Sequence, residues 1–133
     1  MIARARWAAA TLGLLALLGS AAVPAHAIEA DVVVMQGLDK VTARTRTFRV
    51  PVGNTKDFGS LRITARHCYK TPPEEPPERK AFLEIVDRRP DRQPVEVFSG
   101  WMFASSPALN ALEHPVYDVW VIDCTVKQAD SGT

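Results

Sequence analysis

Serine, histidine and aspartate lie close together in one stretch of the sequence, and these are the residue types of a serine hydrolase. Ser105 and Ser106 precede His114 and Asp118. The chemistry would be attack by a serine hydroxyl that a histidine activates as general base. The stretch lacks the G-x-S-x-G turn that exposes such a serine, and Ser106 stands before Pro107, which is typical of a helix start. A serine hydrolase therefore ranks third among the functional hypotheses.

Metal ligation is a second chemistry to consider, with His67, His114 and either Asp118 or Asp123 as the candidate ligands. Their spacing matches neither H-x-H nor H-E-x-x-H, the patterns that bring two histidines to one ion. The sequence also lacks the glycine-rich loops that hold phosphates or dinucleotides. We therefore expect neither a metal site nor a cofactor.

Cys68 and Cys124 are the two cysteines of the chain. An even number of cysteines in an exported protein predicts a disulfide. The bridge would close a long loop, and such a cross-link contributes about 4 kcal/mol in the chain-entropy account. The alternative is a redox-active or metal-binding thiol pair, which typically uses a C-x-x-C motif that this sequence does not contain.

The segment Thr71–Glu78, TPPEEPPE, contains four prolines in eight residues. Proline excludes a helix and a central strand here, so the segment predicts a stiff, polyproline-like loop. Pro73 and Pro76 form a P-x-x-P motif around Glu74 and Glu75. One interpretation is a solvated connection between strands. The other is a presented ligand for a groove on a partner protein, because a rigid loop loses little entropy on binding.

Aromatic residues gather in the last third of the chain. Trp120 lies within a strongly apolar run, which predicts a core position. Trp101 follows Ser99-Gly100, and we expect its ring on the sheet surface, where Met102 and Leu109 would complete a protein-docking patch. If polar groups lined the same ring instead, the site would suit a sugar, since pyranose faces stack on tryptophan.

Residues 1–27 have the layout of a cleaved secretory signal, with two early arginines, an apolar core and the ending Ala25-His26-Ala27. Removing 27 of the 133 residues leaves 106, which is enough for one small domain. Cleavage also reduces the 16 basic residues to 14, against 15 acidic ones, so the net charge changes from +1 to −1. We expect a periplasmic protein that binds no nucleic acid and meets the membrane only through a partner.

The remaining chain divides into an N-terminal arm or edge strand (28–37), a β domain (38–126) and a flexible tail (127–133). Alternating apolar and polar residues predict strands across the domain. The segment 51–59 reads as a turn. Residues 107–112 predict a short helix of about two turns, the one helix before the last strand.

The run Val116–Thr125 is apolar on both faces and predicts a strand in the middle of a sheet. Simple alternation places Val119 and Val121 on one face and Trp120 and Cys124 on the other. With six to seven short strands and one helix, the fold class is all-β, a small antiparallel sandwich or barrel with one disulfide.

Three blocks of the sequence, LDKVTARTRTFRVPVG, CYKTPPEEPPERKAFLEI and FSGWMFASSPALNALEHPVYDVWVIDC, closely resemble a bacterial family of small exported proteins, the domain-of-unknown-function family numbered 2155. The resemblance covers roughly 38–124. It implies a periplasmic location and a compact domain, and it brings no assigned activity and no catalytic residues.

Together these observations predict a non-catalytic domain that acts by contact. The first hypothesis is an accessory or structural protein that docks on an envelope or membrane protein complex through Trp101, Met102 and Leu109, with the proline loop as a second contact. The alternative is a module that binds a glycan or a cell-wall fragment.

Overall fold

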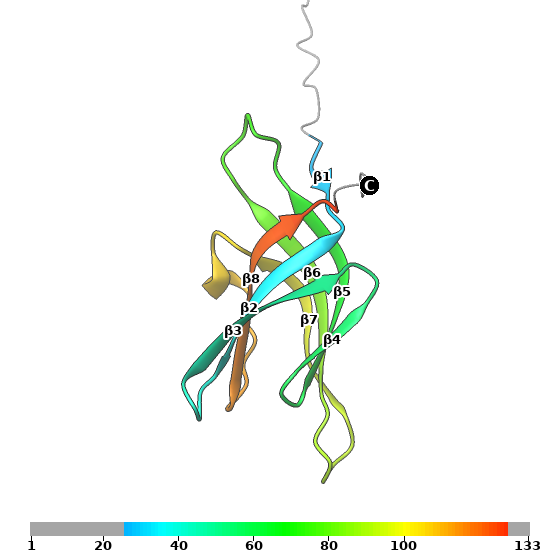
Figure 1. The fold of residues 1–133 in the computed structure, drawn as a ribbon, viewed down its shortest axis with the longest axis vertical. Coiled ribbons are helices and arrows are strands. Elements are labelled where there is room, and N and C mark those ends of the chain that lie inside the picture. The colour runs from blue at the N-terminus through cyan, green and yellow to red at the C-terminus, as the bar shows by residue number, and fades with distance from the viewer. Residues whose placement is uncertain (1–25, 128–133) are drawn as a thin grey trace, which may run out of the picture.

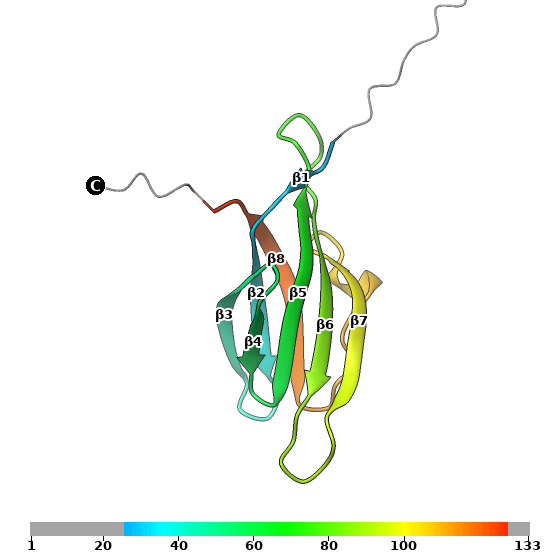
Figure 2. The ribbon, with the colours of Figure 1, turned by 90° about the vertical axis from the view of Figure 1, so that its right-hand side faces the viewer.

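The structure, a computed structural model, describes residues 26–127. Over this range the chain forms two antiparallel sheets that face each other as a sandwich, which confirms the predicted fold class (Figures 1 and 2). The strands are β1 (Ile28–Glu29), β2 (Val32–Asp39), β3 (Arg44–Pro51), β4 (Thr55–Phe58), β5 (Leu61–Lys70), β6 (Arg79–Asp87), β7 (Val95–Phe103) and β8 (Tyr117–Thr125).

The larger sheet has the strand order β1-β5-β6-β7, with β4 also paired to β5, and the smaller sheet has the order β3-β2-β8. The chain crosses between the sheets just after β1. Ala30 donates its backbone N–H to the carbonyl of Cys68 in the larger sheet, and Asp31 donates to the carbonyl of Thr125 in the smaller one (2.8 and 3.0 Å). Two consecutive residues therefore fix both sheets at one end of the sandwich.

The core lies between the two sheets. Its largest fully buried side chains come from alternate positions of the paired strands: Met35, Leu61, Ile63, Leu83, Ile85, Val33, Val50, Val119 and Val121. Each such side chain contributes about 1.5–3 kcal/mol of hydrophobic free energy when it leaves water. The alternation in the sequence therefore reports correctly which face of most strands is buried.

Two segments have more strand than the sequence predicts. Residues 28–37, expected as an arm or edge strand, contain most of β2, which is the middle strand of the smaller sheet, and Val33 and Met35 are fully buried. Residues 51–59, expected as a turn, include β4, which pairs with the start of β5. The number of strands is eight rather than six or seven because β1 and β4, with two and four residues, are too short to show an alternation of their own.

The last strand, β8, is at an edge of the smaller sheet, so the expectation of a central strand is wrong. Trp120 lies opposite Gln36 on the outer side of this sheet and is partly exposed, so it is not a core residue as predicted. The apolar side chains on the second face of β8 thus lie on the outside of the sandwich, where Trp120 is partly exposed and Ile122 is exposed.

The predicted two-turn helix is a single 3-10 turn, η1 (Pro107–Leu109). Leu109 donates its N–H to the carbonyl of Ser106 at 3.0 Å, but the hydroxyl of Ser106 makes no capping bond. The turn ends at Asn110, which is extended and donates its side-chain amide to the carbonyl of Trp101 at 2.9 Å. Contact with β7 therefore replaces a second helical turn.

Two β-bulges determine where the cysteines point. In β5, Ala65 pairs with Leu83 and His67 with Phe82, so Arg66 is an extra residue. In β8 the pairing jumps from Val121 to Asp123, which leaves Ile122 as the extra residue. A bulge shifts the alternation by one position.

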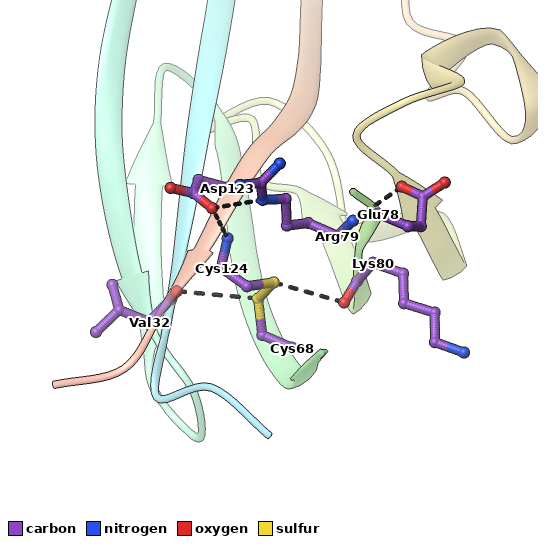
Figure 3. The surroundings of a disulfide bond; sticks show 7 residues. All are labelled: Val32, Cys68, Glu78, Arg79, Lys80, Asp123 and Cys124. Carbon is purple, nitrogen blue, oxygen red and sulfur yellow. Dashed lines mark hydrogen bonds and ion pairs between the residues drawn. A yellow bond between two sulfur atoms is a disulfide. The ribbon is translucent and has the colours of Figure 1, made fainter. Parts of the chain in front are cut away.

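Both cysteines consequently face the core, Cys68 on the same side as Ala65 and Cys124 on the same side as Val121. Simple alternation had placed Cys124 on the face opposite to Val121. They form a disulfide with a Cα–Cα distance of 5.8 Å, which confirms the predicted pair (Figure 3). The bridge joins β5 of the larger sheet to β8 of the smaller one.

Polar contacts surround the disulfide on the β8 side (Figure 3). Arg79 donates from Nε to Oδ1 of Asp123 at 2.9 Å, and the backbone N–H of Cys124 donates to the same oxygen at 2.8 Å. These bonds hold the end of the edge strand β8 beside β6.

Residues 1–25 of the predicted signal and residues 128–133 of the predicted tail lie outside the described residues. Within the described range, no helix has the length and apolarity needed to cross a bilayer.

Candidate functional site

The outer face of the larger sheet carries a cluster of aromatic side chains. We call the set His67, Tyr69, Lys80, Phe82 and Trp101 the aromatic patch. The strand register explains how it forms: His67 of β5 pairs with Phe82 of β6, which pairs in turn with Trp101 of β7, and Tyr69 pairs with Lys80. Three neighbouring strands therefore bring side chains from distant parts of the sequence onto one surface.

Trp101 is the centre of the aromatic patch. Its ring centroid lies 5.9 Å from that of Tyr69, 6.1 Å from that of His67 and 5.4 Å from that of Phe82. Phe82 meets it edge-on, and Nζ of Lys80 lies over its face, 5.2 Å from the centroid. Aromatic pairs and a cation over an indole face each add attraction beyond buried area, so the patch is held in shape before any partner arrives.

The aromatic patch is open to solvent. His67 is exposed, and Tyr69, Phe82 and Trp101 are partly exposed. The side chains of the patch stand on three neighbouring strands, so the patch is a solvent-accessible sheet surface of the kind that a protein partner can cover.

The structure separates the three residues predicted for a docking patch. Trp101 lies on the outer face, but Met102 is 3% exposed and belongs to the core, because neighbouring residues of a strand point to opposite faces. Met102 is thus no part of an exposed surface, and this expectation is corrected. Leu109 is 71% exposed on the 3-10 turn η1, and Asn110 next to it is bonded to the backbone of Trp101.

Sequence reasoning missed four members of the aromatic patch: His67, Tyr69, Lys80 and Phe82. For β6 a signal existed, because Lys80 and Phe82 alternate with the buried residues of that strand. For β5 no signal existed, because the bulge at Arg66 reverses the side to which the following residues point.

The proline loop lies at the end of the sandwich where the described chain begins (Figure 1). Thr71 closes the loop: its N–H donates to the carbonyl of Glu78, and its hydroxyl donates to the carbonyl of Pro76 (both 3.0 Å). A tight turn follows, in which Glu75 donates its N–H to the carbonyl of Pro72 at 3.1 Å. The loop is thus a closed, turned projection and not an extended polyproline segment.

The tip of this loop is presented to solvent. Pro73, Glu74 and Pro76 are exposed, and Glu75 is partly buried. Glu75 and Ile28 line the same hollow of about 290 Å³ beneath the loop. The predicted loop residues are therefore accessible to a partner, on a rigid frame.

Ser105 is hydrogen-bonded to Glu78, the last residue of the proline loop. Its hydroxyl and its backbone N–H both donate to the carboxylate of Glu78. Burial alone would raise the pKa of Glu78, but these bonds, the N–H of Arg79 and the charge of Arg79 outweigh it, so the pKa lies below its ordinary value. Ser105 therefore braces the loop and is bonded to Glu78, not to the histidine of the predicted hydrolase site.

His114 lies in a buried polar cluster at the opposite end of the sandwich. Its Nδ1 accepts the backbone N–H groups of Val116 and Tyr117, both at 3.1 Å. Because both of these partners can only donate, the ring proton must be on Nε2, which donates to Oδ2 of Asp87 at 2.9 Å. Neither ring nitrogen is left to accept a proton from a serine.

Asp87 also accepts hydrogen bonds from Ser60 and Arg89. Oδ1 of Asp87 accepts the hydroxyl of Ser60 at 2.6 Å, and Oδ2 also accepts Nε of Arg89 at 3.1 Å. Burial would raise the pKa of Asp87, but the bonds from Ser60 and His114 and the charge of Arg89 hold it below its ordinary value. The carboxylate stands between serine and histidine, so the order differs from that of a catalytic triad, in which histidine is central.

The proposed hydrolase residues are consequently not brought together, and the metal candidates are not either. Ser105 bonds to Glu78, whereas His114 bonds to Asp87. Among residues 26–127 there is no group of three or more histidine, cysteine, aspartate or glutamate side chains that could hold a metal ion.

The chain is similar to known bacterial proteins. Residues 33–124 match the model of a family described as "Uncharacterized protein conserved in bacteria (DUF2155)". A relative in Rickettsia prowazekii (strain Madrid E), named "Uncharacterized protein RP359", is 31% identical over 87 residues. The matched region is 65% of this chain, and it spans 56% of that relative's length. No solved structure matches the chain.

Proposed function

The chain belongs to the bacterial family DUF2155, and we propose that it is a non-catalytic, exported interaction domain. It docks on a protein of the cell envelope through the aromatic patch, with the proline loop as a neighbouring contact. The observation that carries the proposal is the cluster of three rings around Trp101 on the open face of the larger sheet.

The energetics of such a surface support docking. Tryptophan and tyrosine are enriched among the residues that dominate binding energies at protein interfaces, because they combine a large apolar area with a polar edge. Trp101 and Tyr69 supply both, and the contacts with Phe82 and Lys80 fix their positions. A partner would bind a surface that is already ordered, so little side-chain entropy is lost.

The disulfide supports the proposal that the domain works in the periplasm. Cysteines are kept reduced in the cytosol and are oxidised after export. Cys68 and Cys124 are both buried and joined. The signal layout that ends at Ala27 agrees with this location, since the folded strands begin at Ile28.

A glycan is the second candidate ligand, and one observation favours it. The rings of His67 and Tyr69 lie 14° from parallel, and that of Trp101 is tilted by 22° from His67 and 35° from Tyr69. Sugar rings stack on platforms of this kind. A protein partner takes precedence, because the patch is a sheet surface with several aromatic side chains, a residue type that is enriched at protein interfaces.

Site-specific cross-linking in cells tests the proposed function. A photoreactive amino acid in place of His67 samples the aromatic patch, and the same probe in place of Thr47 samples an exposed position of β3 in the smaller sheet. We expect a discrete adduct with an envelope protein from position 67, lost when Trp101→Ala is added and retained with Trp120→Ala. An equal adduct from position 47, or one that persists with Trp101→Ala, contradicts the proposal.

Fluorescence distinguishes the glycan alternative. Soluble cell-wall fragments are added to the mature protein, which has two tryptophans, Trp101 and Trp120. A saturable change that survives Trp120→Ala and disappears with Trp101→Ala assigns the aromatic patch to a sugar ligand. An unchanged spectrum rejects it.

A further inference from the structure

A hollow of about 480 Å³ lies at the end of the sandwich opposite the proline loop. Its walls come from the β4–β5 turn and from the loop between β6 and β7, which lie side by side at this end (Figure 2). Four arginines line it: Arg62, Arg88, Arg89 and Arg92. The aromatic patch has no residue in common with this hollow.

Carboxylates balance two of these arginines. Asp57 accepts Nε of Arg62 at 3.0 Å, and Asp87 accepts Nε of Arg89 at 3.1 Å. Arg88 and Arg92 have no ion-pair partner among residues 26–127. The hollow therefore holds two guanidinium groups whose charge is not neutralised by this chain.

The electrostatic effect of the unpaired charge reaches the neighbouring carboxylate. The pKa of Asp57 is lowered first by its hydrogen bond from Arg62, against a smaller opposing effect of burial, and further by the charges of Arg62 and Arg88. Arg88 thus acts across the hollow on Asp57 of β4.

The chain holds the loop with the arginines in one shape. Arg88 donates its backbone N–H to the carbonyl of Ser60 at 2.8 Å, which ties the loop to the facing turn. Arg92 donates its N–H to the carbonyl of Arg89 at 3.4 Å, and Pro90 and Pro94 restrict the backbone on either side. The guanidinium groups are thus carried by a constrained backbone.

We propose that this hollow is a binding site for a phosphate group, held by Arg88 and Arg92 with Arg62 at its side. A guanidinium fork donates two parallel hydrogen bonds to oxyanions. A phosphate monoester presents three terminal oxygens, enough for both unpaired forks to bind at once, whereas a carboxylate or a phosphodiester has two. The hollow is larger than one phosphate, so the monoester is part of a larger molecule, either a soluble phosphorylated compound or the monoester headgroup of an envelope lipid.

Titration with inorganic phosphate and with pyrophosphate tests the site. The arginine Nε–Hε signals of the mature, disulfide-bonded protein are followed by NMR. We expect saturable shifts at Arg88 and Arg92, and a loss of affinity of about tenfold or more in Arg88→Ala/Arg92→Ala, as the removal of charge-assisted bonds implies. Asp57→Asn should tighten binding, because it removes the competing carboxylate and frees Arg62.

Arg49→Ala is the matched control, since it removes an exposed arginine of β3 in the smaller sheet. Thermal melting of each variant verifies that the fold is intact. Equal shifts at all arginines, an affinity that the double variant leaves unchanged, or the same loss in Arg49→Ala would overturn the proposal.

Vesicles distinguish the two sources of the phosphate group. Co-sedimentation is measured with phosphatidylcholine alone and with phosphatidylcholine mixed with phosphatidic acid, whose headgroup is a phosphate monoester. Binding to the mixed vesicles that the double variant loses and Arg49→Ala keeps assigns a lipid headgroup. Phosphate binding without vesicle binding assigns a soluble ligand, and the failure of both probes rejects the site.

Discussion

The two ends of the sandwich join the same strand, β8, to the larger sheet by different chemistry. At one end the disulfide links Cys124 of β8 to Cys68 of β5. At the other end His114 holds the first residues of β8 through its Nδ1 and bonds to Asp87 of β6 through its Nε2. The first link is covalent and acts mainly on the unfolded chain, whereas the second depends on satisfied polar groups in a buried setting.

This difference explains how an edge strand can be kept in place. β8 has a partner strand on one side alone, and an edge strand is the element of a sheet that opens most easily. Fixing both of its ends confines it. The two links should therefore differ in size and in their response to pH.

Removal of the disulfide should have the largest effect. Its cysteines are 56 residues apart, so Cys68→Ala/Cys124→Ala should lower the free energy of unfolding by about 4 kcal/mol. Denaturant unfolding under oxidising conditions measures it. The reduced wild-type protein should show a loss of similar size, and a double variant as stable as the oxidised wild type would contradict the covalent role.

Removal of the buried histidine should have the next largest effect. His114→Ala deprives Asp87 of a donor and leaves the N–H groups of Val116 and Tyr117 without an acceptor. Unsatisfied buried groups of this kind cost about 2–4 kcal/mol together. His67→Ala is the matched control, since His67 is exposed. Denaturant unfolding measures both variants. An equal loss of stability in the two would show that His114 and Asp87 do not hold β8 to the larger sheet.

A pair of glycines tests how tightly the His114 end is packed. Gly59 and Gly53 both have positive φ, 57° and 87°, so alanine strains the backbone of each by about 1 kcal/mol. A Cβ at Gly59 would also collide with the ring of Tyr117, whereas one at Gly53 meets nothing. Gly59→Ala should therefore lose about 2 kcal/mol or more, twice the loss of Gly53→Ala, in parallel thermal melts. Equal losses would show that Tyr117 moves aside freely.

Acid should weaken both ends in a smaller and graded way. The pKa values of Asp87 and Glu78 are lowered in the folded protein. Each carboxylate therefore contributes stability that is present above its unfolded pKa, about 4, and that is lost as the pH falls through the lower folded pKa.

The free energy of unfolding should fall with pH below about 4, less steeply in Asp87→Asn and in Glu78→Gln than in the wild type. Denaturant unfolding across this pH range checks the slopes. Hydrogen exchange as the pH falls shows which end opens first. In Asp87→Asn, exchange at the His114 end should depend less on pH than it does in the wild type. A slope that neither variant changes would assign the acid sensitivity elsewhere.

Of the two links that hold β8, the sequence predicted the disulfide and not the one made by His114. Cys68 and Cys124 were paired correctly because, when a chain has two cysteines and both form a disulfide within it, each has the other as its one partner. The link at the other end was not predicted, because Ser60, Asp87 and His114 are far apart in the sequence and have no common spacing. His114 had been considered for hydrolysis and for metal binding, and its bonds to Asp87 and to the start of β8 place it in neither arrangement.

The candidate surface was predicted in part. Trp101 was selected because a tryptophan beside a glycine in a strand has an uncertain face, and it lies at the centre of the aromatic patch. Met102 was placed with it although adjacent strand residues point to opposite sides. His67 and Tyr69 could not be placed, because the bulge at Arg66 is specified by its partner strand β6 and not by the residues of β5 alone.

The sequence by itself determined the fold class, the disulfide partners and the buried face of most strands, because each of these follows from local alternation or from the number of cysteines. The tertiary structure alone decided that β8 is an edge strand, that two bulges turn both cysteines inward and that four arginines surround one hollow. The physical reason is that strand order, register shifts and loop contacts are set by pairings between distant segments, and no single segment of the chain encodes them.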